Sequence, residues 1–270
     1  MMGQEHALVG FGTYAAGTWA LTTTGYIQAQ TAPALAAGAL LAAGAALLPD
    51  IDHPSATVAN AGGIVTKGIA RITNAVSGGH RQGTHQVPFA VVLFVLVWGT
   101  TAGAGKMAQA LGMPELITYQ VHITALWFIS IVAFGAQATS KTFLHQRFNK
   151  LWQQRTGTFA KAYSWGFAAL AFGATWLLCG SPSSWGWVVP AVITGHLSHL
   201  VTDAFTSAGL SILPGVHIYL PILGEAKREN PLQMLLGVAF ALVGIVTILA
   251  TALGQQLQLE LLPFSFGSLV

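Results

Sequence analysis

The chain contains three aspartates, and each of them lies close to a histidine. Asp50 and Asp52 belong to the segment LLPDIDHP together with His53, and Asp203 belongs to GHLSHLVTDAFTSAG together with His199. His199 and Asp203 are four residues apart, so on a helix they lie one above the other on the same face. An imidazole nitrogen and a carboxylate oxygen placed in this way can bind the same metal ion. The pattern predicts a metal site.

Further histidines lie near these aspartates. The segment GGHRQGTHQ carries His80 and His85, five residues apart around Gly83, in a loop that could turn both rings toward one point. His6 opens the first apolar stretch. Taken singly, such residues often serve as helix caps, as solvated loop residues or as interfacial residues. The hypothesis of a site therefore depends on whether the fold brings them together.

Other kinds of catalytic site are not indicated by the sequence. It has no glycine-rich phosphate loop, no GxSxG elbow, no CxxC pair and no HExxH motif. Ser198 lies between two histidines, but adjacent residues on a helix point apart, which disfavours a Ser–His nucleophile. Cys179 is the only cysteine, so no intrachain disulfide can form. A water molecule activated by a metal is the nucleophile that these residues favour.

The composition predicts a membrane protein. Apolar residues make up 53% of the chain and charged residues only 7%, whereas soluble domains carry about 25% charged residues. The net charge of +3 comes from few basic residues, so it is no signature of nucleic-acid binding. Seven stretches approach or reach the length of a membrane span: 7–25, 31–48, 87–105, 117–138, 162–180, 185–201 and 232–253. We therefore predict an all-α polytopic membrane bundle of about seven transmembrane helices, forming a single domain over residues 1–270.

The basic residues predict its orientation. With seven spans, ten of the eleven Lys and Arg residues fall on one side, in loops 49–86, 139–161 and 202–231, and only Lys106 falls on the other. Such an excess marks the cytoplasmic side. The opening MMGQEH lacks the basic region of a cleavable signal, so the first stretch should be retained. This topology delivers all the histidines and aspartates named above to the cytoplasmic ends of the helices. Stretch 7–25 is the weakest of the seven, and without it the N-terminus changes sides.

Loop 49–86 contains a short amphipathic pattern. Apolar residues repeat there at helical spacing, and polar residues occupy the other faces; the apolar set is Val65, Ile69, Ile72 and Val76. Two interpretations stay open. The helix could lie in the headgroup region of the membrane, or it could pack against the rest of the protein.

At these motifs the chain resembles the YdjM family of bacterial inner-membrane proteins, which are regarded as metal-dependent hydrolases. The family's N-terminal His, LPDxDH turn, HRGxTHS-like segment and GxxxHxxxDxxTxxG segment read here, in the same order, as His6, LLPDIDHP, HRQGTHQ and GHLSHLVTDAFTSAG. The segment ILPGVHIYLPIL also resembles the family's Pro-rich return. These motifs cover residues 1–100 and 185–225, and the spans between them match in character only. Gln82 and Gln86 stand where the family favours Gly and Ser.

The resemblance implies a set of functional residues. It points to a metal shell and to two further catalytic residues, with supporting roles for Thr84 and Thr206; Gly209 matches the last position of the family's motif. The implied metal ligands are His6, Asp50, Asp52, His80, His85, His199 and Asp203, and the catalytic residues are His53 and Arg81. His196 does not match the family pattern and is not counted as a ligand. We expect structural roles for His122 and His145, and a place at the rim of the site for His217.

The family in turn resembles zinc-dependent phospholipase C and the P1-type nucleases. Their ligands follow the order His, Asp, His and then HxxxD. In this chain the order is matched by His6, Asp52, His80 or His85, and His199 with Asp203. The further ligands of a third zinc have no counterpart here, so we expect one or two metal ions. Zinc suits a His-rich shell, and manganese or iron stay open because no thiolate selects against them.

These observations predict a hydrolase of the bacterial inner membrane, with its site facing the cytoplasm. The expected substrate is a phosphoester, lipid-linked or delivered by the bilayer, and the planar guanidinium of Arg81 could hold a phosphate oxygen. Two alternatives use the same ligands. A metal-ion transporter or metal-sensing membrane protein should place them near the bilayer midplane, on broken helices. A scaffold should enclose a structural metal in a complete shell.

Overall fold

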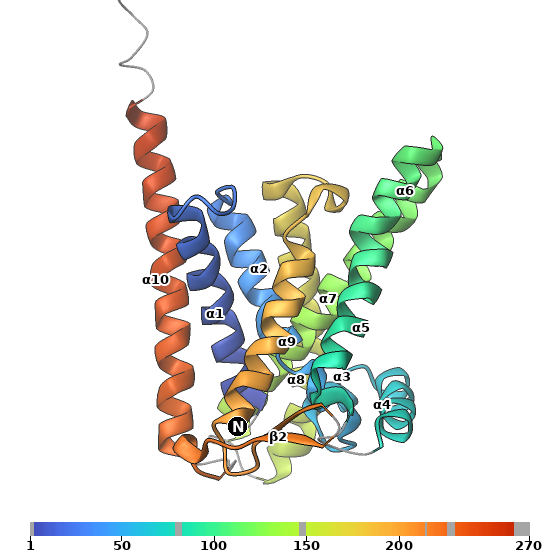
Figure 1. The fold of residues 1–270 in the computed structure, drawn as a ribbon, viewed down its shortest axis with the longest axis vertical. Helices are drawn as coiled ribbons and strands as arrows, with labels where there is room; N and C mark the ends of the chain where they lie inside the picture. The colour runs from blue at the N-terminus through green and yellow to red at the C-terminus, as the bar shows by residue number, and fades with distance from the viewer. Residues whose placement is uncertain (1–2, 79–82, 146–149, 214, 226–229, 262–270) are drawn as a thin grey trace, which may run out of the picture.

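The computed structural model describes residues 3–78, 83–145, 150–213, 215–225 and 230–261, and it is a bundle of helices (Figure 1). The described helices are α1 (Gly3–Thr23), α2 (Ala32–Ala45), α3 (Thr57–Ala61), α4 (Ile64–Ser77), α5 (Val87–Trp98), α6 (Ala104–Leu111), α7 (Pro114–His145), α8 (Lys150–Cys179), α9 (Val188–Ala204) and α10 (Pro231–Leu261). Single helical turns connect them: η1 (Leu48–Asp52), η2 (Gly83–His85), η3 (Gly99–Gly103), η4 (Pro182–Ser184) and η5 (Pro221–Leu223).

Five described segments are long and apolar enough to cross a membrane. They are Ala32–Asp52, Val87–Leu111, Ile117–Ser140, Lys161–Cys179 and Pro231–Gln255. The prediction of an all-α, multi-pass membrane protein is therefore confirmed. The predicted stretches 7–25 and 185–201 form α1 and α9 but are not among the five. Thr and Gly dilute the apolar character of α1, and α9 has only 17 residues. Seven spans stay a prediction.

Helix α2 lies at the centre of the packing. It contacts α1, α7, α8, α9 and α10, and α1 packs in turn against α10 and α9. Its sequence APALAAGALLAAGA has few large side chains, so neighbouring helices come close to its backbone. Leu41, Ala42 and Ala45 are completely buried. The small residues of α2 therefore bring α1 and α9, which carry His6 and His199, to the same helix.

Two glycines set how closely these helices approach. A Cβ at Gly195 of α9 would clash with the carbonyl group of Ala42, and a Cβ at Gly10 of α1 would lie 2.8 Å from the same carbonyl oxygen. Both helices thus touch α2 at one point of its backbone. In membrane bundles, small residues commonly permit such contacts.

A small antiparallel hairpin follows α9 and was not expected from the sequence. Strands β1 (Leu210–Leu213) and β2 (Val216–Ile218) pair Leu210 with Ile218. Gly209 precedes β1 with a φ of +65°, and a Cβ there would lie 2.5 Å from Nε2 of His217. Glycine suits this left-handed, crowded position. The hairpin and the N-terminus lie at the same end of the bundle (Figure 1).

Candidate metal centre

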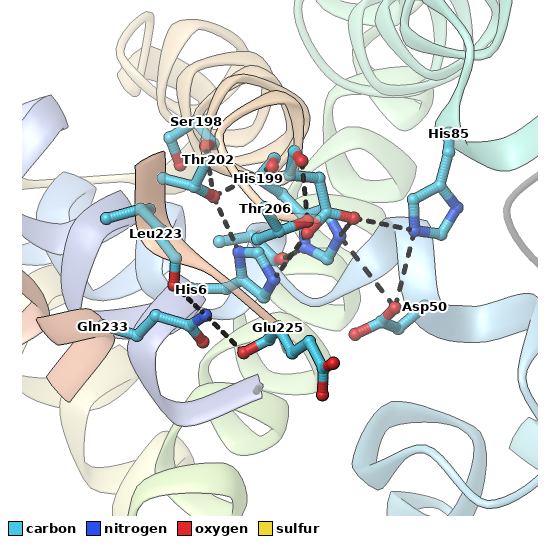
Figure 2. Close-up of polar contacts among 12 residues, drawn as sticks. His6, Asp50, His85, Ser198, His199, Thr202, Thr206, Leu223, Glu225 and Gln233 are labelled. Atoms are coloured by element: carbon cyan, nitrogen blue, oxygen red, sulfur yellow. Dashed lines mark hydrogen bonds and ion pairs between the residues drawn. The ribbon is translucent and has the colours of Figure 1, made fainter. Parts of the chain in front are cut away.

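Two overlapping groups of side chains could hold a metal ion, and His199 belongs to both. One group is His6, His199 and Asp203, and the other is Asp50, His85 and His199. In each group the ligand atoms all lie within 4.8 Å of one another. Figure 2 shows the three imidazole rings and the carboxylate of Asp50 turned toward a common point. We call these five residues the His/Asp cluster.

Asp203 connects the three rings of the cluster. Its Oδ1 lies 3.4 Å from Nε2 of His6, and its Oδ2 lies 3.5 Å from Nε2 of His199 and 3.7 Å from Nε2 of His85. Oδ1 of Asp50 lies 3.6 Å from Nε2 of His85 and 3.9 Å from Nε2 of His199. These distances exceed those of ordinary hydrogen bonds. They approach the separation of about 3.3–3.6 Å between ligands that a tetrahedral metal holds at 2.0–2.2 Å.

The cluster is almost closed to solvent. His6, His85, His199 and Asp203 are at most 2% exposed, whereas the side chain of Asp50 is 24% exposed. A buried carboxylate is strongly unfavourable unless a positive charge or a metal compensates it. Because its side chain is partly exposed, Asp50 marks the side from which a small molecule can reach the cluster.

The backbone at the C-terminal end of α2 orients the ring of His199. Nδ1 lies 2.6 Å from the carbonyl oxygen of Ala46. A carbonyl oxygen only accepts hydrogen bonds, so Nδ1 carries the proton and the neutral ring has its lone pair on Nε2. Within the described part of the chain, this Nε2 is buried without a hydrogen-bond partner.

A hydroxyl group orients the ring of His6 in the same way. Nδ1 lies 2.9 Å from Oγ1 of Thr202. The single hydroxyl proton of Thr202 points to the backbone of α9, where the carbonyl oxygens of Ser198 and His199 lie 3.0 and 2.9 Å away. The hydroxyl oxygen can then accept a hydrogen bond from Nδ1 of His6, which leaves the lone pair on Nε2.

A longer chain of hydrogen bonds orients His85. Thr84 donates its hydroxyl proton to Oδ2 of Asp52 at 2.6 Å, and its oxygen lies 3.1 Å from Nδ1 of His85. Having donated its only proton, the hydroxyl accepts from Nδ1, and Nε2 again holds the lone pair. Asn74 of α4 donates to the carbonyl oxygen of Asp52 at 2.7 Å. Burial is the main cause that lowers the pKa of His85, which favours the neutral ring that a metal requires.

These three arrangements share one consequence. In the neutral rings the Nδ1 protons face the protein, and the Nε2 lone pairs face the carboxylates of Asp50 and Asp203. Electron pairs that face one another repel unless a positive charge lies between them. Outer hydrogen bonds of this kind are characteristic of metal-binding histidines. The chemistry of the donor atoms and their spacing therefore fit a divalent metal ion.

The remaining predicted residues lie around the cluster or outside the described part. Asp52 is completely buried and belongs to neither metal-capable group; it supports Thr84 instead. His53 is half-buried, and its Nδ1 faces the hydroxyl of Ser55 at 2.8 Å. The hydroxyl of Thr206 donates to the carbonyl oxygen of Asp203 at 2.8 Å. His80 and Arg81 lie outside the described residues.

The other histidines stand apart from both groups. His196 is completely buried, and its ring centre lies 5.6 Å from that of Phe89. His122 is exposed, and its Nδ1 lies 2.7 Å from the carbonyl oxygen of Thr118 in the same helix. Nδ1 of His217, in the hairpin, lies 3.2 Å from the hydroxyl of Ser211. The side chain of His145 lies outside the described residues.

Sequence reasoning missed the groups that orient the rings. Thr202 is a polar residue next to Asp203 near the end of an apolar helix, and that position was a usable signal. Asn74 was visible only as one of the polar residues of an amphipathic pattern. The carbonyl group of Ala46 leaves no trace in the sequence, because any residue supplies one.

Replacing Thr202 by valine is expected to weaken metal binding roughly 10- to 100-fold, because outer hydrogen bonds of ligand histidines contribute that much. Valine keeps the shape of threonine but removes the acceptor for Nδ1 of His6. Isothermal titration calorimetry of the metal-free protein with zinc measures the dissociation constant of each variant. Thr175→Val is the control, because the hydroxyl of Thr175 bonds to the carbonyl oxygen of Ala171 in its own helix. Equal affinities in the two variants would contradict the role of Thr202.

Comparison with known proteins adds one match. A family model described as YdjM inner membrane protein matches residues 1–266 of the chain. No curated protein and no solved structure matches it. The matched range includes every residue of the His/Asp cluster. It also covers helices α6 to α8, where the sequence motifs gave no specific resemblance.

Proposed function

The chain belongs to the YdjM inner membrane protein family, and we propose that it is a metal-dependent hydrolase that uses the His/Asp cluster. The observation that carries this proposal is the common orientation of His6, His85 and His199, whose Nε2 atoms converge on two carboxylates. His6, His199 and Asp203 would hold one ion. Asp50 and His85, together with the shared His199, offer a second position.

The residues of the cluster have different roles in the proposed reaction. A bound divalent metal lowers the pKa of water toward neutrality and polarises a phosphoryl or carbonyl oxygen. Asp203 is buried and faces all three rings, so it holds them in place. The carboxylate of Asp50 is the partly exposed one, so the metal position that it lines is the one that a substrate can reach. The buried surroundings exclude bulk water and strengthen these charges.

The position of the cluster supports an enzyme over a transporter. Asp50 follows α2, His85 precedes α5, and Asp203 lies in the last turn of α9. Helix α9 runs unbroken from Val188 to Ala204, whereas transporter sites use interrupted helices near the midplane. At the helix ends the reacting group of a lipid would be its headgroup, so we propose a phosphoester as substrate. Arg81, beside His80 in the sequence, supplies the cation that neutralises the negative charge of the phosphoester.

A substrate screen on metal-loaded protein tests this proposal. The purified protein, in detergent and in vesicles, is offered soluble and lipid-linked phosphoesters, carboxylic esters and amides. Cleavage of a phosphoester is the expected result. Cleavage of only esters or amides would overturn the substrate class and retain the hydrolase. No hydrolysis, together with metal-dependent ion uptake into proteoliposomes, would favour the transporter.

We further propose seven spans, with α1 and α9 crossing the membrane and the cluster facing the cytoplasm. This orientation follows from the distribution of Lys and Arg. Reporter fusions after Gln30, Lys106 and Val270 are expected outside the cytoplasm, and fusions within 141–161 inside. An N-terminus on the outer side would place His6 across the membrane from the expected face and contradict the topology.

A further inference from the structure

Helix α4 carries an apolar surface that the described protein does not cover. Only Thr66 and Ala70 of this helix are buried. Its large apolar residues are exposed: Ile64 by 87%, Val65 by 64%, Ile69 by 46%, Ile72 by 68% and Val76 by 83%. Of the two interpretations that the sequence left open, packing against the rest of the protein therefore lacks support. The uncovered residues need another apolar environment.

The faces of α4 are arranged in a particular order. With 3.6 residues per turn, each residue is turned by about 100° from the last. Val65, Ile69, Ile72 and Val76 form one stripe, and the buried Thr66 and Ala70 lie roughly 110° around the helix from it. Lys67 and Arg71 lie roughly 100° further in the same direction, nearly opposite the stripe. A helix that packs sideways against the bundle thus turns its apolar stripe one way and its basic residues the other.

This arrangement of apolar, buried and basic faces is typical of a helix that lies in the plane of a membrane surface. We propose that α4 lies in the plane of the leaflet nearest the His/Asp cluster, with its stripe among the acyl chains. Lys67 and Arg71 then reach anionic phosphate groups, and α4 contains no acidic residue to oppose them. Its place in the fold agrees. Helix α5, a candidate span, begins at Val87, soon after α4 ends, and α4 lies beside the end of the bundle that carries β2 and the N-terminus (Figure 1).

The same helix contacts both turns that lead to the cluster. Asn74 holds the carbonyl oxygen of Asp52 in η1, and a Cβ at Gly83 of η2 would lie 3.1 Å from Ser77. Asp52 and Thr84, in these two turns, hold His85 through the hydrogen bonds described above. The lipid surface that positions α4 therefore also positions the turns that carry Asp50 and His85.

Depth-dependent fluorescence quenching tests the location of α4. In a Cys179→Ser background, single cysteines are introduced as Ile72→Cys and Arg71→Cys and labelled with an environment-sensitive dye. The protein is reconstituted into phosphatidylcholine–phosphatidylglycerol vesicles that contain lipids brominated on their acyl chains. Strong quenching at position 72 and weak quenching at position 71 are expected. Equal quenching at both positions would overturn the proposal. So would an unquenched position 72 that crosslinks to a second copy of the chain.

A second experiment tests the connection to the cluster, and it rests on the proposed metal binding, whereas the quenching test does not. Ile72→Asp places a charge in the apolar stripe and is expected to weaken zinc binding in vesicles about tenfold, the lower range for losing outer support of a ligand. Ala75→Asp is the matched control, because Ala75 is exposed on the same helix outside the stripe. Equal zinc dissociation constants in the two variants would overturn the connection. If wild-type protein binds no zinc, the proposed function fails while the quenching result stands.

Discussion

The variant Asp203→Ala is expected to lose its bound divalent metal while it still inserts in the membrane. Asp203 is the residue whose two oxygens face all three histidine rings, so its loss removes the carboxylate of the first metal position and a negative charge beside the second. Elemental analysis of the detergent-purified variant measures metal per chain, and size-exclusion chromatography shows whether the protein remains monodisperse. We expect occupancy to fall to the background of the preparation.

The matched control is His122→Ala. It removes a histidine that is exposed and hydrogen-bonded within its own helix, and it should keep the full metal content. Unchanged occupancy in both Asp203→Ala and His199→Ala would show that the ion binds elsewhere. Loss in His122→Ala as well would show that elemental analysis reports the quality of the preparation and not the site.

Hydrolysis of a phosphoester is expected to stop when a chelator removes the metal and to return when zinc or manganese is added. A metal contributes several kcal/mol to such reactions, so the rate should fall at least about 100-fold. Initial rates before chelation, after chelation and after metal addition measure the effect. Activity that survives complete removal of the metal would exclude the proposed mechanism.

Arg81→Ala separates catalysis from metal binding. A guanidinium group is no metal ligand, so the metal content should stay near that of the wild type. The turnover number should fall by roughly 100-fold, as when one preorganised donor is removed. Lys106→Ala is the control, because Lys106 is an exposed basic residue of α6, which the proposed topology places on the opposite side of the membrane. A loss of metal in Arg81→Ala would show that Arg81 maintains the structure of the site, which would contradict a purely catalytic role.

The fold could be predicted from composition, but not in every part. Long apolar stretches such as 232–253 are recognisable because a bilayer requires an apolar helix of fixed length. Helices α1 and α9 are harder to classify, because they lie among other helices and carry polar residues. The hairpin Leu210–Ile218 escaped prediction because its strands have four and three residues, too short for a periodic pattern.

The site could be predicted by residue type more readily than by role. The pair His199 and Asp203 follows from helical spacing alone, and the structure places both in the cluster. Asp50 and Asp52 were both predicted as ligands, but of the two only Asp50 belongs to a metal-capable group. Two residues of a turn can point in different directions, and no local pattern says which one faces the site. Only the tertiary position of Thr84 shows that Asp52 supports a histidine. Long-range contacts of this kind carry no local signature.

Position 195 offers a means of sorting related sequences. Gly195 lets α9 touch the backbone of α2 at Ala42, one turn before Ala46, whose carbonyl oxygen holds His199. Any larger side chain at 195 must displace α9 and lengthen the 2.6 Å contact between Nδ1 of His199 and that oxygen. A relative that retains the five residues of the cluster but has a bulky residue at this position is therefore expected to have lost the metal. Glycine or a compensating change in α2 would mark the relatives that keep it.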